Sequence, residues 1–266
     1  MKSIILAAGE GTRLRPYTNY IPKCMVEVKG KSLIDRQLEV LRFEGVHNIT
    51  VIGGYRADKL TNPNITLRYN PKYNSTNMLW TLFCAKDQLN SDEDIIISYG
   101  DIVYSHKILN ELISSNADIA LSVDLNWESY WRSRSPDPLE DAETLRFDKN
   151  SILTEIGQKP RAINEIQGQY MGLIKFSKNG QKKLRSVFQK GVDNGDIRGK
   201  IPEKAYMTDL MQMMIDEGIS IKSIGIQDYW VEVDTVEDLL SEETRIRLDH
   251  IANECSIERD KRNNLD

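Results

Sequence analysis

Residues that hold zinc or build disulfide frameworks are scarce in this sequence. Its 266 residues include three scattered cysteines, at positions 24, 84 and 255, and three histidines without metal-ligand spacing. An odd number of scattered cysteines is typical of reduced thiols in a cytoplasmic protein. We therefore expect no zinc site and no disulfide-stapled fold, and we predict a cytoplasmic location.

Long apolar runs, internal repeats and an excess of positive charge are also missing. Without a run of about 20 apolar residues, no membrane span is expected. The N-terminus opens directly into an apolar strand pattern, so no signal peptide is expected. The net charge of -5 disfavours a nucleic-acid-binding surface. A hydrophobic content of 40% is ordinary for a globular protein, and we predict one domain over residues 1–266.

Strand and helix patterns alternate through the first 125 residues. Short apolar runs predict strands at 4–8, 49–52, 65–69, 94–98 and 117–123. Amphipathic spacing predicts helices at 32–44, 77–89 and 108–113. This alternation implies an α/β fold, with a mostly parallel sheet and helices on both faces.

The pattern changes in the second half of the chain. The aromatic, charged and proline-bearing segment 126–142 predicts a long functional loop. Further strands are expected at 143–148, 151–156, 169–176, 219–226 and 230–233. Helices are expected at 177–189 and 206–217, with a polar loop at 190–204. From Thr235 onward we predict one helix, continuous or broken, with a frayed or disordered end from Glu258 to Asp266.

The most informative stretch follows the first predicted strand. Residues 9–23 read Gly-Glu-Gly-Thr-Arg-Leu-Arg-Pro-Tyr-Thr-Asn-Tyr-Ile-Pro-Lys. A buried strand that opens into a glycine-rich loop is where α/β folds bind phosphates, because no Cβ keeps the backbone N–H groups away. Arg13, Arg15 and Lys23 add positive charge at the same end of the sheet.

The spacing in this loop excludes two commoner phosphate-binding loops. A dinucleotide fingerprint needs a third glycine where Leu14 stands, and a Walker A loop ending at Lys31 needs a glycine where Met25 stands. The remaining pattern is Gly-x-Gly-Thr-Arg-x-x-Pro-x-Thr-x-x-x-Pro-Lys. It resembles the signature loop of the nucleotidyltransferases that join a nucleoside monophosphate to a phosphorylated small molecule. The resemblance implies a Rossmann-like sheet with inserted acceptor-binding strands and a C-terminal helix.

Acidic residues stand just past two predicted strands, at Asp101 and Asp234. Position alone also allows a purely structural role for each, with Asp101 as a turn residue and Asp234 as a helix N-cap. Carboxylates at strand ends commonly hold the divalent cation that bridges phosphate oxygens. The resemblance implies that these two residues bind Mg²⁺, that Arg13 lies along the triphosphate, and that Lys23 steadies charge at the α-phosphate. Arg13 and Lys23 are therefore the predicted catalytic residues.

The predicted nucleotide site takes residues from several segments. The resemblance implies that the backbone of residues 6–9 lies against the nucleoside. The full predicted set is Leu6, Ala7, Ala8, Gly9, Gly11, Thr12, Arg13, Lys23, Gly54, Asn77, Tyr99 and Gly100. An Asn-rich turn at 70–77 replaces the glutamine and the Pro-x-Gly-x-Ala stretch of the sugar nucleotidyltransferases. This turn resembles that of the bacterial phosphocholine cytidylyltransferases and their relatives acting on phosphoglutamine or aminoethylphosphonate, and it implies CTP.

The acceptor site is predicted from aromatic and acidic residues of the second half. Aromatic faces enclose quaternary ammonium groups by cation–π attraction. The candidates are Trp127, Tyr130, Tyr170, Asp209, Trp230 and Glu232. The alternative for each aromatic ring is that it packs in the core of this half.

Together these observations predict a Mg²⁺-dependent cytidylyltransferase. It would transfer CMP from CTP to a small phosphorylated zwitterion with release of pyrophosphate, for decoration of a cell-surface polysaccharide. Residues 1–125 would bind the nucleotide, 126–240 the acceptor, and 241–266 would form a charged helix or tail, with a homodimer left open. The alternatives are a sugar-1-phosphate nucleotidyltransferase using UTP or dTTP, and a catalytically inactive nucleotide-binding regulatory subunit.

Overall fold

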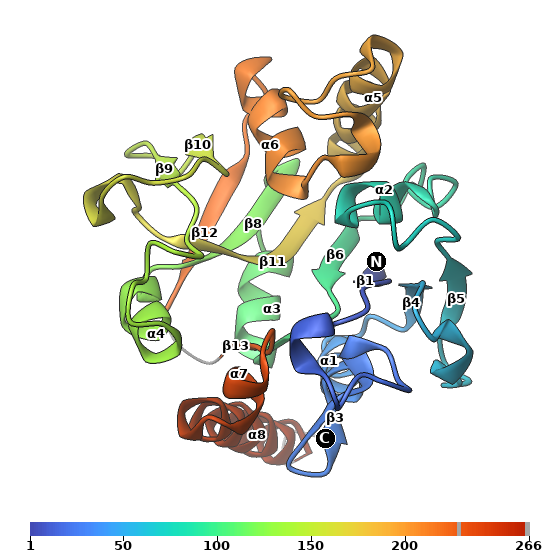
Figure 1. Cartoon of the computed structure of the whole chain (residues 1–266), viewed down its shortest axis with the longest axis vertical. Coiled ribbons are helices and arrows are strands. Elements are labelled where there is room, and N and C mark those ends of the chain that lie inside the picture. Colours follow the sequence, from blue (N-terminus) through green and yellow to red (C-terminus); the bar gives the residue numbers. More distant parts are fainter. Residues whose placement is uncertain (228–229, 264–266) are drawn as a thin grey trace.

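A seven-stranded sheet runs through the protein in the computed structural model, which describes residues 1–227 and 230–263 (Figure 1). The strand order is β12-β8-β11-β6-β1-β4-β5. The strands are β1 (Lys2–Ala7), β4 (Asn48–Gly53), β5 (Thr66–Tyr69), β6 (Ile95–Tyr99), β8 (Ile119–Asp124), β11 (Gln169–Phe176) and β12 (Lys222–Ile226). Only β11 runs antiparallel to its neighbours, so the mostly parallel sheet expected from the sequence is confirmed.

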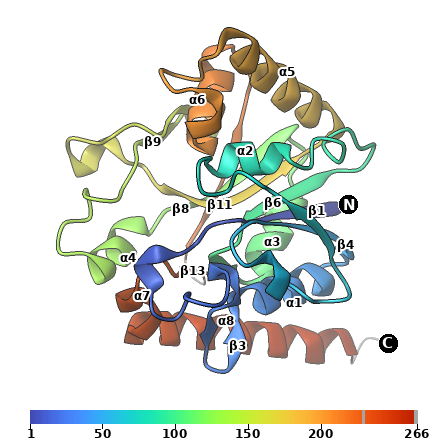
Figure 2. The same cartoon turned by 45° about the vertical axis from the view of Figure 1, so that its right-hand side comes forward.

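Helices cover both faces of this sheet (Figure 2). One face carries α1 (Leu33–Phe43) and α3 (His106–Ile113), and the other carries α2 (Met78–Phe83), α5 (Lys178–Asn194) and α6 (Met207–Asp216). Neighbouring residues of β1 show why both faces are apolar. Ile5 packs in the core of the first face and Ile4 in the core of the second, and both are fully buried.

A third, smaller core lies beneath the glycine-rich loop. It joins β7 (Ile102–Tyr104), β13 (Trp230–Glu232), α7 (Val236–Leu240) and α8 (Glu242–Asn263). Strand β13 pairs antiparallel with β7, with Glu232 opposite Ile102. Because β7 follows β6 almost directly, this pairing brings the residues after β13 beside Asp101. The remaining short elements are β2 (Glu27–Val28), β3 (Lys31–Ser32), β9 (Leu145–Phe147), β10 (Leu153–Ile156), η1 (Thr12–Leu14), η2 (Lys23–Met25), η3 (Ala57–Lys59), η4 (Ile163–Glu165) and η5 (Pro202–Lys204).

The segment 126–142 is not the uninterrupted loop that its composition suggests. It contains α4 (Trp127–Arg134), which places the rings of Trp127, Tyr130 and Trp131 on one buried face. Their spacing of three and four residues is helical, but the polar residues around them, Glu128, Ser129 and Arg132, hid the pattern. The prediction of a loop was wrong here because only tertiary packing buries these rings.

Several element ends also differ from the sequence prediction. Helix α2 ends at Phe83 instead of continuing to Leu89. Helix α5 extends to Asn194, into the predicted loop, and ends at Gly195 in the left-handed region. The C-terminal helix is broken at Ser241. Residues 258–263 of the predicted frayed end belong to α8, and residues 264–266 lie outside the described part of the chain. None of the helices described is long and apolar enough to cross a membrane.

Candidate active site

The carboxyl ends of β1, β4 and β6 form one edge of the sheet at a reversal of chain order. Strand β4 lies on one side of β1, and the later strand β6 lies on the other. A reversal of this kind opens a crevice in which open α/β sheets bind ligands. A pocket lies there, lined by Leu6, Ala7, Ala8, Gly9, Lys23, Cys24, Tyr73, Thr76, Asn77, Met78, Thr81, Tyr99, Gly100 and Asp101. Most of the nucleotide-binding residues predicted from the sequence are thus brought together.

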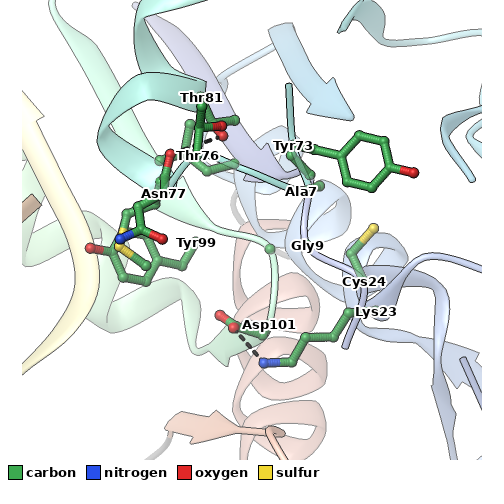
Figure 3. A pocket seen from close by; sticks show the side chains of 14 residues that line it. Ala7, Gly9, Lys23, Cys24, Tyr73, Thr76, Asn77, Thr81, Tyr99 and Asp101 are labelled. Carbon is green, nitrogen blue, oxygen red and sulfur yellow. Dashed lines mark hydrogen bonds and ion pairs between the residues drawn. The ribbon is translucent and has the colours of Figure 1, made fainter. Parts of the chain in front are cut away.

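The two long walls of the pocket differ in chemistry (Figure 3). Thr76, Asn77 and Thr81 lie on one side, around the start of α2, and Lys23 and Asp101 lie on the opposite side. The first wall is uncharged and presents hydroxyl and amide groups, whereas the second is charged. This division suits a nucleoside on the first side and its phosphates on the second.

Buried Asn70 fixes the wall that α2 provides. Its side-chain Nδ2 donates hydrogen bonds to the hydroxyls of Thr76 at 3.0 Å and Thr81 at 2.9 Å. The Asn-rich turn that set this sequence apart therefore shapes the pocket. Sequence reasoning missed Tyr73, Thr76 and Thr81 as lining residues, although the turn that positions them had been noticed.

Two glycines allow close approach of the backbone at the sheet edge. The Gly100 amide donates to the Leu6 carbonyl at 2.9 Å, and a Cβ at residue 100 would lie 2.8 Å from that oxygen. A Cβ at Gly54 would lie 2.7 Å from the Ala8 carbonyl oxygen and 2.5 Å from Tyr73 Cβ. Gly54 was predicted to touch the nucleotide, but it lies behind Ala8 and is not among the lining residues.

Gly100→Ala should destabilise the protein by about 1–3 kcal/mol, because the new methyl group meets backbone atoms that cannot turn away. The matched control is Gly9→Ala, since a Cβ there meets nothing within 4 Å. Urea unfolding of both variants measures the effect. Equal free energies of unfolding for the two variants would contradict the close approach.

The glycine-rich loop is folded so that it supports Lys23. Gly11 has a φ of 63°, and its carbonyl accepts a hydrogen bond from the Thr18 hydroxyl at 2.7 Å. A Cβ at residue 11 would lie 3.0 Å from Lys23 Cβ, so both the conformation and the packing favour glycine here. Thr12 and Arg13 follow in η1 and are exposed. Leu14, the next residue, is fully buried and anchors the turn.

Lys23 bridges the two carboxylates that the sequence assigned to metal. Its Nζ donates to Asp101 Oδ2 at 2.7 Å and to Asp234 Oδ1. Arg13 Nη2 donates to the second oxygen of Asp234 at 3.0 Å. Burial opposes charge on the Lys23 amine, but the two carboxylates outweigh it and its pKa is raised. Four residues far apart in the sequence therefore form one charged cluster.

Glu232 joins this cluster, although the sequence placed it in the acceptor site. Asp101, Glu232 and Asp234 each offer a carboxylate oxygen, and these three atoms lie within 4.8 Å of one another. Burial raises the pKa of Glu232, and the neighbouring Asp234 charge adds to the effect. Asp101 Oδ1 is buried and has no hydrogen-bond partner among the residues that the structure describes, so one ligand oxygen is still available. An all-oxygen set of this kind fits Mg²⁺.

Three of the predicted acceptor residues are core residues. Trp127, Tyr130 and Trp230 are each at most 4% exposed, and their rings contact one another or Trp131. The Tyr130 ring faces two guanidinium groups of the chain itself, from Arg134 and Arg247. The structure therefore gives these three rings the packing role that the sequence had left as the alternative.

The other two predicted acceptor residues lie nearer the pocket or at a helix start. The Tyr170 ring packs edge-on against Tyr99, a lining residue, with centroids 5.7 Å apart. Asp209 is buried at the start of α6, where it accepts the Tyr206 amide at 2.8 Å and pairs with Lys200 at 2.6 Å. Tyr170 thus keeps a place beside the site, whereas the Asp209 carboxylate is occupied in capping its helix.

Comparison with known proteins shows that the chain is similar to nucleotidyltransferases. The family model described as the MobA-like NTP transferase domain matches residues 3–146. The chain is 40% identical over 250 residues to a CTP:phosphoglutamine cytidylyltransferase from Campylobacter jejuni, covering 90% of this chain and 98% of that protein. It is 35% identical over 119 residues to a choline-phosphate cytidylyltransferase from Streptococcus pneumoniae, which is 43% of this chain and 51% of that protein.

Solved structures show the same fold. The CTP:phosphocholine cytidylyltransferase from Streptococcus pneumoniae matches with a TM-score of 0.70 and 24% identity, covering 89% of this chain and 95% of that one. The inositol-1-phosphate CTP transferase from T. maritima matches with a TM-score of 0.73 and 21% identity, covering 94% and 95%. At these identities the likeness concerns the fold, which is the Rossmann-like nucleotidyltransferase type expected from the sequence.

Proposed function

Because the chain belongs to the MobA-like NTP transferase family of nucleotidyltransferases, we propose that it transfers CMP from CTP to a small phosphorylated zwitterion and releases pyrophosphate. The observation that carries this proposal is the position of Lys23. Its amine lies between Asp101 and Asp234 at one side of a pocket built by the glycine-rich loop. The relative that is 40% identical along nearly its whole length is a cytidylyltransferase, which favours CTP.

The reaction requires positioning and charge more than covalent chemistry. An oxygen of the acceptor phosphate attacks the α-phosphorus of CTP in line. A new phosphorus–oxygen bond forms, the bond between the α-phosphorus and its bridging oxygen to the β-phosphate breaks, and pyrophosphate leaves. No covalent enzyme intermediate is needed, because the acceptor itself is the nucleophile.

The charged cluster provides the groups that this reaction needs. Lys23 and Arg13 would turn from the carboxylates to the phosphate oxygens of CTP, and Asp101, Asp234 and Glu232 would hold Mg²⁺. The ion, when bound, neutralises charge that develops on the phosphates. Arg13 is suited to such a movement because its side chain is 60% exposed.

The acceptor is proposed to carry both a positively charged nitrogen group and an acidic group, as phosphocholine, phosphoglutamine or aminoethylphosphonate types do. The relatives support this, since their names give phosphoglutamine and choline phosphate as acceptors.

The CDP-linked product would serve the decoration of a cell-surface polysaccharide, and the enzyme would work in the cytoplasm. We also propose that residues 1–266 act as one domain, since the central sheet takes strands from both halves, and that the protein forms a homodimer.

Pyrophosphate release tests the proposal. With Mg²⁺ and CTP, we expect turnover with at least one of phosphocholine, phosphoglutamine and aminoethylphosphonate, and none with glucose 1-phosphate. Removal of Mg²⁺ with EDTA should abolish turnover, and added Mg²⁺ should restore it. Turnover only with UTP or dTTP and glucose 1-phosphate would instead establish the sugar nucleotidyltransferase alternative. Nucleotide binding without any turnover would favour the inactive subunit.

A further inference from the structure

Arg134, the last residue of α4, joins two carboxylates at the border of the charged cluster. Its Nη1 donates to Glu232 at 2.6 Å, while Nε and Nη2 donate to the two oxygens of Asp238 at 2.9 and 3.2 Å. Burial opposes its charge, but Glu232 and Asp238 outweigh it, so the pKa of the guanidinium is raised. Arg134 is thus a permanent cation that holds two acidic groups from another part of the chain.

Asp238, which Arg134 holds, is hydrogen-bonded in turn to the backbone at Asp234. One oxygen of Asp238 accepts the backbone amides of Asp234 at 2.9 Å and Thr235 at 3.0 Å. These bonds fix the turn from β13 into α7, on which the Asp234 side chain is carried. Arg134 therefore reaches one candidate metal carboxylate directly, through Glu232, and another through Asp238 and the backbone.

The surroundings of Arg134 differ from those of Arg13. Its side chain is 12% exposed, against 60% for Arg13, and it lies over the rings of Tyr130 and Trp131 at 5.4 and 5.5 Å. Arg13 has space to turn toward a nucleotide. Arg134 is enclosed by aromatic rings and carboxylates, so its guanidinium keeps its place when the phosphates arrive.

We propose that Arg134 is a positioning residue that holds Glu232 and Asp234 in the orientation needed to bind the divalent cation. The inference rests on the proposed metal-dependent function. A planar guanidinium with several donors spans two carboxylates at once, which a lysine ammonium at the same place does not. Groups that orient metal ligands commonly contribute about 10-fold to 100-fold in metal affinity.

The test measures Mn²⁺ binding to the whole protein, with electron paramagnetic resonance as the method of detection. Arg134→Lys should weaken Mn²⁺ binding about 10-fold to 100-fold. The matched control is Arg132→Lys, because Arg132 lies on the same helix, is 51% exposed and pairs only with Glu128 among the described residues. The Mg²⁺ concentration for half-maximal pyrophosphate release should shift by a similar factor, with kcat restored at saturating Mg²⁺.

The possible outcomes separate the inference from the proposed function. A wild-type protein that binds no Mn²⁺ contradicts the metal site and, with it, the role of Arg134. If wild type binds Mn²⁺ and Arg134→Lys binds it equally well, or loses activity that saturating Mg²⁺ does not restore, the role of Arg134 alone is contradicted.

A second variant keeps the test decisive if Arg134→Lys does not fold, as judged by circular dichroism. Asp238→Asn retains the shape of the side chain but weakens its pairing with Arg134. It should weaken Mn²⁺ binding in the same direction. When Arg134→Lys does fold, the two losses in the double variant should be less than additive, because both residues act through one path. Full additivity, or unchanged binding in Asp238→Asn, would contradict that path.

Discussion

Asp101→Asn is expected to lower kcat by about a thousandfold, which corresponds to roughly 4 kcal/mol of transition-state stabilisation. The carboxylate follows β6 and accepts a hydrogen bond from Lys23, and its other oxygen is buried without a partner in the described part of the chain. The amide has nearly the same shape but lacks the charge that a divalent cation needs. Steady-state pyrophosphate release with CTP and the preferred acceptor measures the loss.

The control for this variant is Asp87→Asn, which removes an exposed carboxylate that pairs with Arg68 at the surface. It should leave kcat unchanged. Mn²⁺ binding should be weakened in Asp101→Asn and not in Asp87→Asn. Near-normal turnover of Asp101→Asn would overturn the assignment of Asp101 to the metal.

Lys23→Met is expected to lower kcat about 100-fold to 1000-fold, since it removes the cation placed to stabilise charge at the α-phosphate. It should also destabilise the metal-free protein by roughly 3–5 kcal/mol, because it leaves Asp101 and Asp234 close together without their shared partner. Added Mg²⁺ should recover part of that stability, as the ion replaces the missing positive charge. Thermal unfolding with and without Mg²⁺ measures this.

Lys190→Met provides the comparison for Lys23→Met. Lys190 lies on α5, is 57% exposed and pairs with Glu217. Its replacement should change neither kcat nor the response of stability to Mg²⁺. A Lys23→Met protein with wild-type stability and no response to Mg²⁺ would argue against the shared position of the amine and the ion.

The nucleotide half of the site was predictable because its signals are local in the sequence. The apolar run that forms β1 leads directly into the glycine-rich loop, so Lys23 and the residues around Gly9 were assigned from the motif of this loop and its resemblance to the nucleotidyltransferases. Helix α1 was predicted for the same reason. Its N-cap, Ser32, accepts the Asp35 amide at 3.1 Å, and such a cap depends only on neighbouring residues.

The acceptor half stays a prediction, and the sequence could not choose among its aromatic residues because each has two uses. A tryptophan or tyrosine serves a ligand cage or a hydrophobic core equally well, and composition does not distinguish them. Here Arg134 and Arg247 face the Tyr130 ring, so cations of the chain itself occupy the place predicted for an acceptor. Tyr170 stays a candidate because it lies beside Tyr99.

By itself, the sequence determined the parallel sheet, the loop that ends β1, and the identity of Lys23, Asp101 and Asp234 as candidates. Those features depend on hydrophobic period, glycine spacing and motif. The tertiary fold was needed to show that Glu232 lies with the candidate metal carboxylates Asp101 and Asp234, and that Arg134 holds it. These contacts depend on the pairing of β13 with β7 and on the burial of α4, which join residues about a hundred positions apart. No local pattern records which distant strand or helix a segment will meet.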